Sequence, residues 1–428
     1  MVGADLRDRL LQLARWAAFR TFVRPLPAPR GRSADGERVV LFKPDRIGDF
    51  VLATGVIRLL SDHLGPSRCT LCVSELNAEL ARVVFPHLRV VAVPAARIGG
   101  WGDVRSHRVT ACRALAGEAG ARVISLRHDR CLYDSAQIRW LGPTAVTALR
   151  ALYPQEVLPE ERLLAGLAVQ WIAPPRVTPP GGAVVVEGMP GHQSQPGAWT
   201  PGGRSEASGA CVEQERHRLL AESVLGRRVG LEEVTPRMDL GPSPGRKELL
   251  VAPFGSAPIR TYPAARLIDV LAQVTHRWDG EVRLTGGPDQ SGALIELERE
   301  AIRRGVRRLA GLSSMSLADY ARRVAGAAGV LTMESAPAHF ACALDRPMVA
   351  IVGGGHYGIF APWWRSEHQV WLTHRVPCFG CHWHCSQTAP FCVQDIPAAE
   401  VAEAVLGVLG CGFPPSRCER ADGSRLLG

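Results

Sequence analysis

Lysine is almost missing from this chain of 428 residues, which has 50 Lys and Arg in total but lysine only at Lys43 and Lys247. The net charge of +9 is therefore carried by arginine, a bias that GC-rich codon usage explains as well as a nucleic-acid partner does. Long apolar runs are missing too, since no stretch approaches the roughly 20 residues that span a bilayer. No signal peptide is visible either, so we expect a cytoplasmic protein. Because the charge bias is weak evidence and no nucleic-acid-binding motif is recognised, we expect no nucleic-acid partner.

Aromatic residues are few, at 6%, but hydrophobic residues reach 46%, which is typical of a globular protein. The length leaves room for two domains of ordinary size. Changes in composition predict four parts: residues 1–36, a first domain at 37–240, a second domain at 247–410, and a tail at 411–428.

The first part has the pattern of a basic amphipathic helix followed by a linker. Between residues 5 and 24, apolar positions such as Leu6, Leu10 and Leu13 share one face, and arginines lie on or beside the other. Such a helix suits an anionic membrane surface, and a helix that packs on the domain is the alternative. The Pro- and Arg-rich residues 25–36 form the linker.

The stretch at residues 38–60 organises the rest of the chain. A short apolar strand at 39–42 runs into a polar turn that contains Lys43 and Arg46, and the spacing of apolar residues is helical afterwards. In open α/β sheets such a turn lies at the carboxyl edge of the strands, where ligands bind, so Asp49 is expected at a helix start beside a binding site. The alternative is that Asp49 only caps the helix and Arg46 is solvated.

The alternation of strand and helix continues through the first domain and predicts a parallel sheet covered by helices, the α/β class. Expected strands lie at residues 69–73, 88–93 and 123–126, and expected helices at 77–84 and 108–117.

A charged cluster follows the strand at 123–126, at the same expected edge of the sheet. Together with the polar turn it supplies candidate contacts to a polar acceptor, although a solvated loop is the alternative. These candidates are Lys43, Arg46, Arg127, His128 and Asp129.

Residues 173–210 are dense in Pro, Gly and Ser, which predicts a flexible insert in the first domain. A helix resumes at 212–225, and 235–246 has the composition of a linker between domains.

Several strands of the second domain end in small or Gly-rich turns, most of them before helices. Free backbone amides and the positive end of a helix dipole converge at such turns, which suits a nucleotide phosphate. The candidate binding residues in these turns are Gly255, Ser256, Arg260, Asp289, Glu334, Ser335, Ala336, Pro337, Ala338 and His339. For His339 a core or capping role is the alternative.

Four of the twelve cysteines lie together within residues 378–392, and the other eight are scattered. The clustered ones are Cys378, Cys381, Cys385 and Cys392. Four thiolates at such spacing predict a closed structural site for zinc or iron. The alternative is a set of reduced cysteines in an irregular loop.

Three motifs stand out along the chain: DRIGDFVLATGVIR near its start, PFGSAPIRTYPAARL at the beginning of the second domain, and MESAPAHFACALDRPMVAIVG late in it. Together they resemble the ADP-heptose:lipopolysaccharide heptosyltransferases, glycosyltransferase family 9. The resemblance covers roughly residues 38–405 without the insert. It implies the GT-B architecture, two Rossmann-like domains with a cleft between them, the first binding the acceptor and the second the nucleotide sugar.

The resemblance also implies roles for particular residues. Family members transfer heptose from ADP-heptose to a sugar hydroxyl with inversion, and by position Asp49 is the general base. The turns of the second domain become the donor site, with Arg260 facing the diphosphate. Glu334 stands where the family commonly has Asp. No Asp-x-Asp occurs, so the resemblance implies catalysis without a metal.

The function expected from the sequence is thus inverting transfer of heptose, or of a similar nucleotide-linked sugar, to a hydroxyl of a lipopolysaccharide core or related glycan. A protein acceptor of the autotransporter type is one alternative, since relatives with a cysteine cluster near this position modify such proteins. A metal-stabilised nucleotide- or nucleic-acid-binding protein is the alternative of another class. Peripheral contact with the inner face of the cytoplasmic membrane is part of the expectation.

Overall fold

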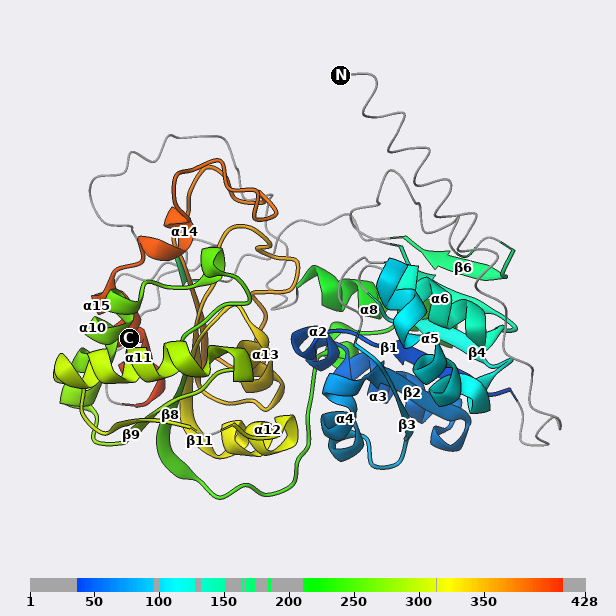
Figure 1. Cartoon of the computed structure of the whole chain (residues 1–428), viewed down its shortest axis with the longest axis horizontal. Coiled ribbons are helices and arrows are strands. Elements are labelled where there is room, and N and C mark those ends of the chain that lie inside the picture. The colour runs from blue at the N-terminus through cyan, green and yellow to red at the C-terminus, as the bar shows by residue number, and fades with distance from the viewer. Residues whose placement is uncertain are drawn as a thin grey trace. The chain divides into compact units, whose positions relative to one another are not determined.

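The computed structural model of the chain describes residues 37–95, 101–127, 132–150, 164, 166–173, 184–185, 211–312 and 314–410 (Figure 1). The predicted helix and linker at 1–36, the predicted tail at 411–428 and most of the predicted insert lie outside these residues, as do His128 and Asp129. The chain divides into two compact units. Among the described residues, unit 1 holds those up to 173 and 215–234, and unit 2 holds 184–185, 211–214 and those from 235 onward.

Unit 1 contains a sheet of six parallel strands in the order β3-β2-β1-β4-β5-β6. β1 and β2 are buried along their whole length, as expected of strands covered on both faces. The strands are β1 Val39–Lys43, β2 Cys69–Ser74, β3 Arg89–Val93, β4 Arg122–Ser125, β5 Val146–Leu149 and β6 Val169–Ile172. The helices are α2 Ile47–Leu52, α3 Thr54–Leu64, α4 Ala78–Val84, α5 Trp101–Leu115, α6 Leu132–Leu141, α8 Val212–Leu225, whose first three residues belong to unit 2, and α9 Leu231–Val234, with 3-10 turns η1 Pro66–Arg68, η2 Glu75–Asn77 and η3 Ala116–Glu118.

Unit 2 contains a sheet of seven parallel strands in the order β10-β9-β8-β11-β12-β13-β7. Its strands are β7 Val184–Val185, β8 Arg246–Ala252, β9 Glu281–Leu284, β10 Leu309–Gly311, β11 Ala327–Met333, β12 Met348–Ile351 and β13 Gln369–Thr373. Its helices are α10 Ala264–Arg277, α11 Ser291–Arg303, α12 Leu317–Gly326, α13 Ala336–Ala343, α14 Phe391–Gln394 and α15 Ala398–Val408, with 3-10 turns η4 Pro258–Arg260 and η5 Pro288–Gln290. In Figure 1, α11 and α12 lie in front of the strands of this unit.

Both sheets reverse their strand order at one point. In unit 1 the first strand, β1, pairs with β2 on one side and β4 on the other, and in unit 2 β8 pairs in the same way with β9 and β11. The strand order reverses between β1 and β4 in unit 1 and between β8 and β11 in unit 2. The connections that follow these two strands run to opposite sides, which opens a crevice at the carboxyl ends of the pair. Each unit therefore places two turns side by side where an α/β sheet binds its ligands.

The alternation predicted from the sequence is confirmed, and two parallel α/β units with the Rossmann strand order give the predicted α/β class. The helix predicted at 212–225 has those bounds as α8. Elements with weaker patterns, such as β5, β6 and α12, are absent from the prediction because they are short or carry mixed polar residues. Within the described residues, no helix is long and apolar enough to cross a membrane.

One predicted boundary differs from the structure. The sequence assigns the insert at 173–210 to the first domain, but its residues Val184–Val185 form β7, which pairs with β13 of unit 2. The division between the units also comes at Thr235, earlier than the predicted end of the first domain at 240. Composition marks a change of character in the chain, but it does not say which sheet edge a short strand joins.

Candidate functional site

Asp49 lies in the first turn of α2, directly after the carboxyl end of β1. Its side chain is half-buried. The N-cap position of α2 belongs to Arg46, whose side chain makes no capping hydrogen bond. Asp49 is thus not the N-cap residue itself, but a carboxylate in the first turn interacts favourably with the helix dipole, so the alternative of a capping role stays open.

A buried ion-pair network fixes the turn that precedes Asp49. The fully buried Lys43 lies with Nζ 2.8 Å from Asp45 Oδ2 and donates to the carbonyl oxygen of Leu126, also at 2.8 Å. The other oxygen of Asp45 pairs with Arg127, which reaches Asp134 Oδ2 at 2.7 Å from Nη2. These pairs tie the turn after β1 to the turn after β4, as expected at a switch point.

Two of the predicted acceptor contacts are thus engaged inside unit 1. Lys43 has no exposed surface, and Arg127 shares its guanidinium between two carboxylates, so both hold the turn in place. The prediction that Lys43 touches an acceptor directly is wrong for this reason. Arg46 is exposed, and it stays a candidate contact.

Three more residues of this network carry no signal in the local pattern of the sequence. Ser74 Oγ and Asn77 Nδ2 both donate to the carbonyl oxygen of Asp45, at 2.9 and 2.8 Å. Asp134 accepts from Arg127. Each of these residues follows or faces the end of a strand, and only the strand order reveals that they meet.

In unit 2 the turn after β8 presents Arg260 at the end of η4. Arg260 Nη1 donates to Ser256 Oγ at 3.2 Å, and Nη2 lies 3.3 Å from His356 Nδ1, which accepts. The backbone N–H of Gly255 donates to Thr261 Oγ1 at 3.1 Å, which closes the turn. A Cβ at Gly255 would lie 2.6 Å from the Cβ and the carbonyl oxygen of Arg260, so only glycine fits there.

Glu334 directly follows β11, the strand next to β8. Its side chain is 6% exposed, and Oε2 has no hydrogen-bond partner among the described residues. Burial raises its pKa to about 7, and the nearby Arg260 opposes that rise. A carboxyl group with this pKa is close to half-protonated at neutral pH, so it can accept or donate a hydrogen bond.

Helix α13 begins directly after Glu334, with Ser335 at its N-cap and Pro337 in its first turn. Ser335 Oγ donates to the carbonyl oxygen of Met333 at 3.2 Å instead of capping the helix. The first amides of α13 therefore lack a side-chain cap at the switch point, an arrangement that favours an anion. Of the predicted small residues in this turn, Ala336 and Pro337 are half-buried and Ala338 is buried.

His339 is surrounded by aromatic side chains. Its ring stacks on Trp363 at a centroid distance of 6.1 Å, and its Nδ1 accepts from Trp363 Nε1 at 3.0 Å. Burial lowers the pKa of His339 to about 4, so the ring is neutral at physiological pH. These contacts are those of a core histidine, the alternative role that the sequence left open.

Asp289, another predicted donor residue, is exposed on η5 after β9. That strand is one position away from the switch point, so Asp289 follows a different strand from the turns that contain Arg260 and Glu334.

The turn after β12, another Gly-rich strand end of unit 2, contacts Arg260 through His356. It has the spacing Gly353-x-Gly355-x-x-Gly358, which resembles a nucleotide-binding fingerprint. No helix follows it, however, so it does not present the helix start that such a fingerprint needs. A Cβ at Gly353 or Gly355 would instead meet the ring of Trp383 at 2.5 or 2.3 Å, so this turn is glycine-rich to accommodate an indole.

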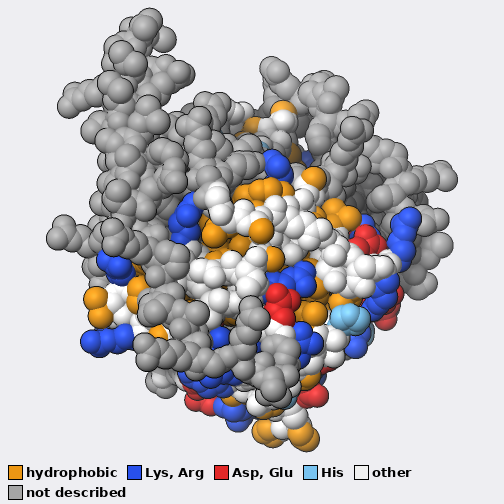
Figure 2. Space-filling view, turned by 90° about the vertical axis from the view of Figure 1, so that its right-hand side faces the viewer, with side chains coloured by type: hydrophobic (Ala, Val, Ile, Leu, Met, Phe, Trp, Pro, Cys, Tyr) orange, Lys and Arg blue, Asp and Glu red, His pale blue; other side chains and the backbone are white. Residues whose placement is uncertain are grey.

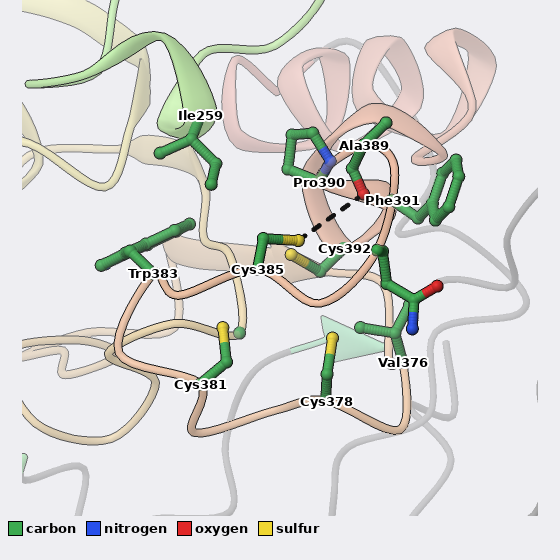
Figure 3. Close-up of a pocket in the computed structure, with 12 residues that line it drawn as sticks. Ile259, Val376, Cys378, Cys381, Trp383, Cys385, Ala389, Pro390, Phe391 and Cys392 are labelled. Carbon is green, nitrogen blue, oxygen red and sulfur yellow. Dashed lines mark hydrogen bonds between the residues drawn. The ribbon is translucent and has the colours of Figure 1, made fainter. Parts of the chain in front are cut away.

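The four clustered cysteines line one pocket with Trp383 and Ile259 (Figure 3). Their sulfur atoms point into a common region, and Cys385 Sγ lies 3.8 Å from the carbonyl oxygen of Ala389. Burial raises the pKa of Cys392 to about 11, and burial followed by the neighbouring thiols raises that of Cys378. Among the described residues, no three His, Cys, Asp or Glu side chains are arranged as they stand to hold a metal ion.

Residues 222–386 match the model of glycosyltransferase family 9 (heptosyltransferase). A comparison with curated protein sequences finds no match.

Solved structures show the same fold. The ADP-heptose lps heptosyltransferase II of E. coli has a TM-score of 0.58 at 14% identity, with 87% of this chain and 98% of that chain covered. E. coli heptosyltransferase WaaC with ADP has a TM-score of 0.57 at 16% identity, covering 87% and 99%. A family 9 glycosyl transferase from Veillonella parvula has 0.57 at 13% identity, covering 89% and 99%.

Proposed function

Since residues 222–386 belong to glycosyltransferase family 9, we propose that this chain transfers heptose, or a similar sugar, from a nucleotide diphosphate donor to a hydroxyl of a glycan acceptor, with inversion. The chain is a glycosyltransferase with the two-domain GT-B fold. The observation that supports a nucleotide donor is the switch point of unit 2, where Arg260, Glu334 and the start of α13 follow two adjacent strands.

In the donor site that we propose, each of these groups has its own role. The leaving nucleotide gains negative charge on its diphosphate, and a guanidinium can donate two parallel hydrogen bonds to phosphate oxygens. The uncapped amides of α13 add donors and the positive end of the helix dipole. Glu334 is the group there that can accept from a sugar or ribose hydroxyl. ADP-heptose is the donor that the E. coli relatives' titles name, and we extend it to this chain as a proposal.

The base that we propose is Asp49. A sugar hydroxyl is a weak nucleophile at neutral pH, and a carboxylate within hydrogen-bond reach takes its proton as the new bond to the anomeric carbon forms. Asp49 suits this role because the ion pairs of Lys43, Asp45 and Arg127 hold the backbone in front of it rigidly. The reaction needs no metal in this scheme, since Arg260 and α13 supply the positive charge.

The acceptor that we propose is a lipopolysaccharide core or a related glycan, bound by unit 1 with Arg46 as one contact. A protein acceptor is the second candidate, favoured by the cysteine cluster that the sequence analysis connects with such enzymes. Peripheral contact with the inner membrane face belongs to the first candidate, because a lipid-linked acceptor is presented there.

A structural zinc or iron at the four cysteines is a further part of the proposal. The chemistry of the donor set fits, because four thiols share one pocket and none of the described cysteines forms a disulfide. Cys378, Cys381, Cys385 and Cys392 would hold the ion, which would stabilise the loop and leave no open position for catalysis. Metal analysis of the purified chain against the double variant Cys378→Ser/Cys381→Ser tests this, and equal metal content in both would contradict it.

The alternative of a nucleic-acid-binding protein finds little support on the described part of the face drawn in Figure 2. On the face drawn in Figure 2, the described Lys and Arg side chains are interspersed with acidic and apolar side chains. A wide surface of one sign is what non-specific binding to a phosphate backbone needs.

The experiment that tests the proposal has two steps. Calorimetry first compares ADP with a mixed-sequence oligonucleotide, and we expect saturable binding of ADP alone. Nucleotide sugars are then screened on lipopolysaccharide core and on protein acceptors, with mass spectrometry as the readout. Tight binding of the oligonucleotide without binding of ADP would overturn the proposal, and the mass added to each acceptor decides between the two acceptor classes.

A further inference from the structure

Arg260 is held on three sides by residues of unit 2. Its guanidinium reaches Ser256 and His356, as described above, and its Cζ lies 4.6 Å from the centroid of the Trp383 ring. That distance is well within the range of a cation–π interaction, and tryptophan is the strongest partner for it. Trp383 belongs to the cysteine loop, residues 376–392, for which the sequence predicts a structural metal site.

The cysteine loop is fixed to the turn after β12 by its backbone. Gly380 N donates to the carbonyl oxygen of Gly354 at 2.8 Å, and His382 N donates to that of Gly355 at 3.0 Å. Trp383 then lies against Gly353 and Gly355, where any Cβ would collide with its indole. The indole therefore has little room to move, and the arginine stacked on it is confined as well.

The backbone of the loop is strained at this point. His382 and Trp383 have φ values of 50° and 64°, in the left-handed region that residues with a Cβ seldom adopt. Such conformations persist only where the surrounding contacts over-determine them, and they concentrate at binding sites. Cys381 and Cys385 flank this segment and line the same pocket as Trp383 (Figure 3). Two of the four thiols thus lie beside the segment that carries the indole.

We propose that Trp383 is a positioning residue that holds the guanidinium of Arg260 in place for the donor diphosphate, so that the cysteine loop is part of the donor site. This inference rests on the proposed function, because it takes Arg260 as a diphosphate ligand. An arginine side chain loses considerable rotamer freedom when it binds, and a guanidinium that is already stacked loses less. Stacking on a ring face also leaves the in-plane N–H groups directed at oxygen acceptors.

Calorimetry of ADP binding to Trp383→Leu tests this proposal. We expect the dissociation constant for ADP to rise about three- to fivefold, the range of a partly exposed cation–π contact. Adenosine carries no diphosphate, so its binding should stay unchanged, a difference that general loosening of the loop would not produce. Trp383→Phe keeps an aromatic face and should lose about half as much binding free energy for ADP. It also serves as the folded variant if Trp383→Leu does not fold.

Two controls separate Trp383 from the rest of the loop. Phe379→Leu removes another aromatic ring of the same loop, one that packs on Gly354 and Tyr357. The second control is Arg260→Ala, alone and combined with Trp383→Leu, because an effect that passes through Arg260 must vanish in its absence.

The outcomes are distinct. Unchanged ADP binding in Trp383→Leu, an equal loss in Phe379→Leu, or a loss that persists in the Arg260→Ala background would each overturn the inference. If the wild-type chain does not bind ADP at all, it is the proposed function that fails, together with the inference that rests on it.

Discussion

Glu334 combines burial with an oxygen that has no hydrogen-bond partner among the described residues. Burial disfavours its charged form, and the charge of Arg260 compensates only in part, which is why its pKa rises to about 7. Such a group calls for an explanation, and we propose a ligand hydroxyl, because Glu334 directly follows a central strand of the sheet.

The pH dependence of stability should reveal this carboxyl group. The folded state holds its proton more tightly than the unfolded one, so its contribution is fully present below pH 4.5 and is lost as the pH rises through about 7. The wild type therefore loses stability from pH 5 to pH 8, and Glu334→Gln does not lose this part. The free energy of unfolding of the variant minus that of the wild type should rise by about 2 to 3 kcal/mol over this range. Urea unfolding at both pH values measures this. A change as large in Glu296→Gln, an exposed carboxylate of α11, would contradict the assignment to burial.

Asp49 is the residue on which the proposed chemistry depends. Asp49→Asn keeps the shape of the side chain but removes the base, so turnover should fall by roughly 10² to 10⁴-fold. The dissociation constant for ADP should stay within about twofold, because the donor site that we propose lies in unit 2. Steady-state kinetics and calorimetry give the two values. Asp62→Asn, an exposed carboxylate on α3, is the matched control and should leave both unchanged, whereas full activity of Asp49→Asn would remove Asp49 from the mechanism.

At the scale of elements, the turn after β8, which we propose as part of the donor site, is closely packed. Gly255 approaches Arg260 so closely that a single methyl group would enter the space of its Cβ and carbonyl oxygen. The following 3-10 turn η4 carries Arg260 to the end of the strand, and Thr261 closes the turn by accepting from Gly255 N. The turn is therefore one unit, and the position of the guanidinium depends on its backbone.

Gly255→Ala should displace this turn and with it Arg260. We expect the affinity for ADP to fall by about tenfold or more, because the arginine and the turn amides move together. Calorimetry measures the loss. Gly292→Ala is the matched control, since no atom lies within 4 Å of its new Cβ and the position is helical. That change should stabilise α11 by roughly 0.5 to 1 kcal/mol and leave ADP binding as it was.

At the scale of the whole molecule, two units with the same strand order carry different chemistry at the same place. Unit 1 has a carboxylate in front of a buried ion-pair network, and unit 2 has an arginine, a buried glutamate and an uncapped helix start. This difference supports the roles that we propose, proton abstraction in unit 1 and binding of an anionic ligand in unit 2.

Hydrogen exchange in the presence of ADP should show this division. We expect slower amide exchange in residues 253–261 and 334–340 of unit 2, and no change at the start of α2 in unit 1. Mass spectrometry of peptides with and without saturating ADP gives the map, and adenosine shows how much depends on the diphosphate. Protection confined to unit 1 would reverse the roles that we assign to the two units.

The sequence by itself determined the α/β class, most strands and helices, and the turns in which Asp49, Arg260 and Glu334 lie. These features depend on apolar periodicity and on small residues over short stretches, which a local pattern contains. The tertiary structure decided which turns meet. The bond from Lys43 to Leu126 joins residues 83 positions apart, and that from Arg260 to His356 joins residues 96 positions apart. Such contacts follow from strand order, which no local pattern encodes. Because of that order, Lys43 is buried and holds the turn after β1 in place, and Trp383 packs on Arg260.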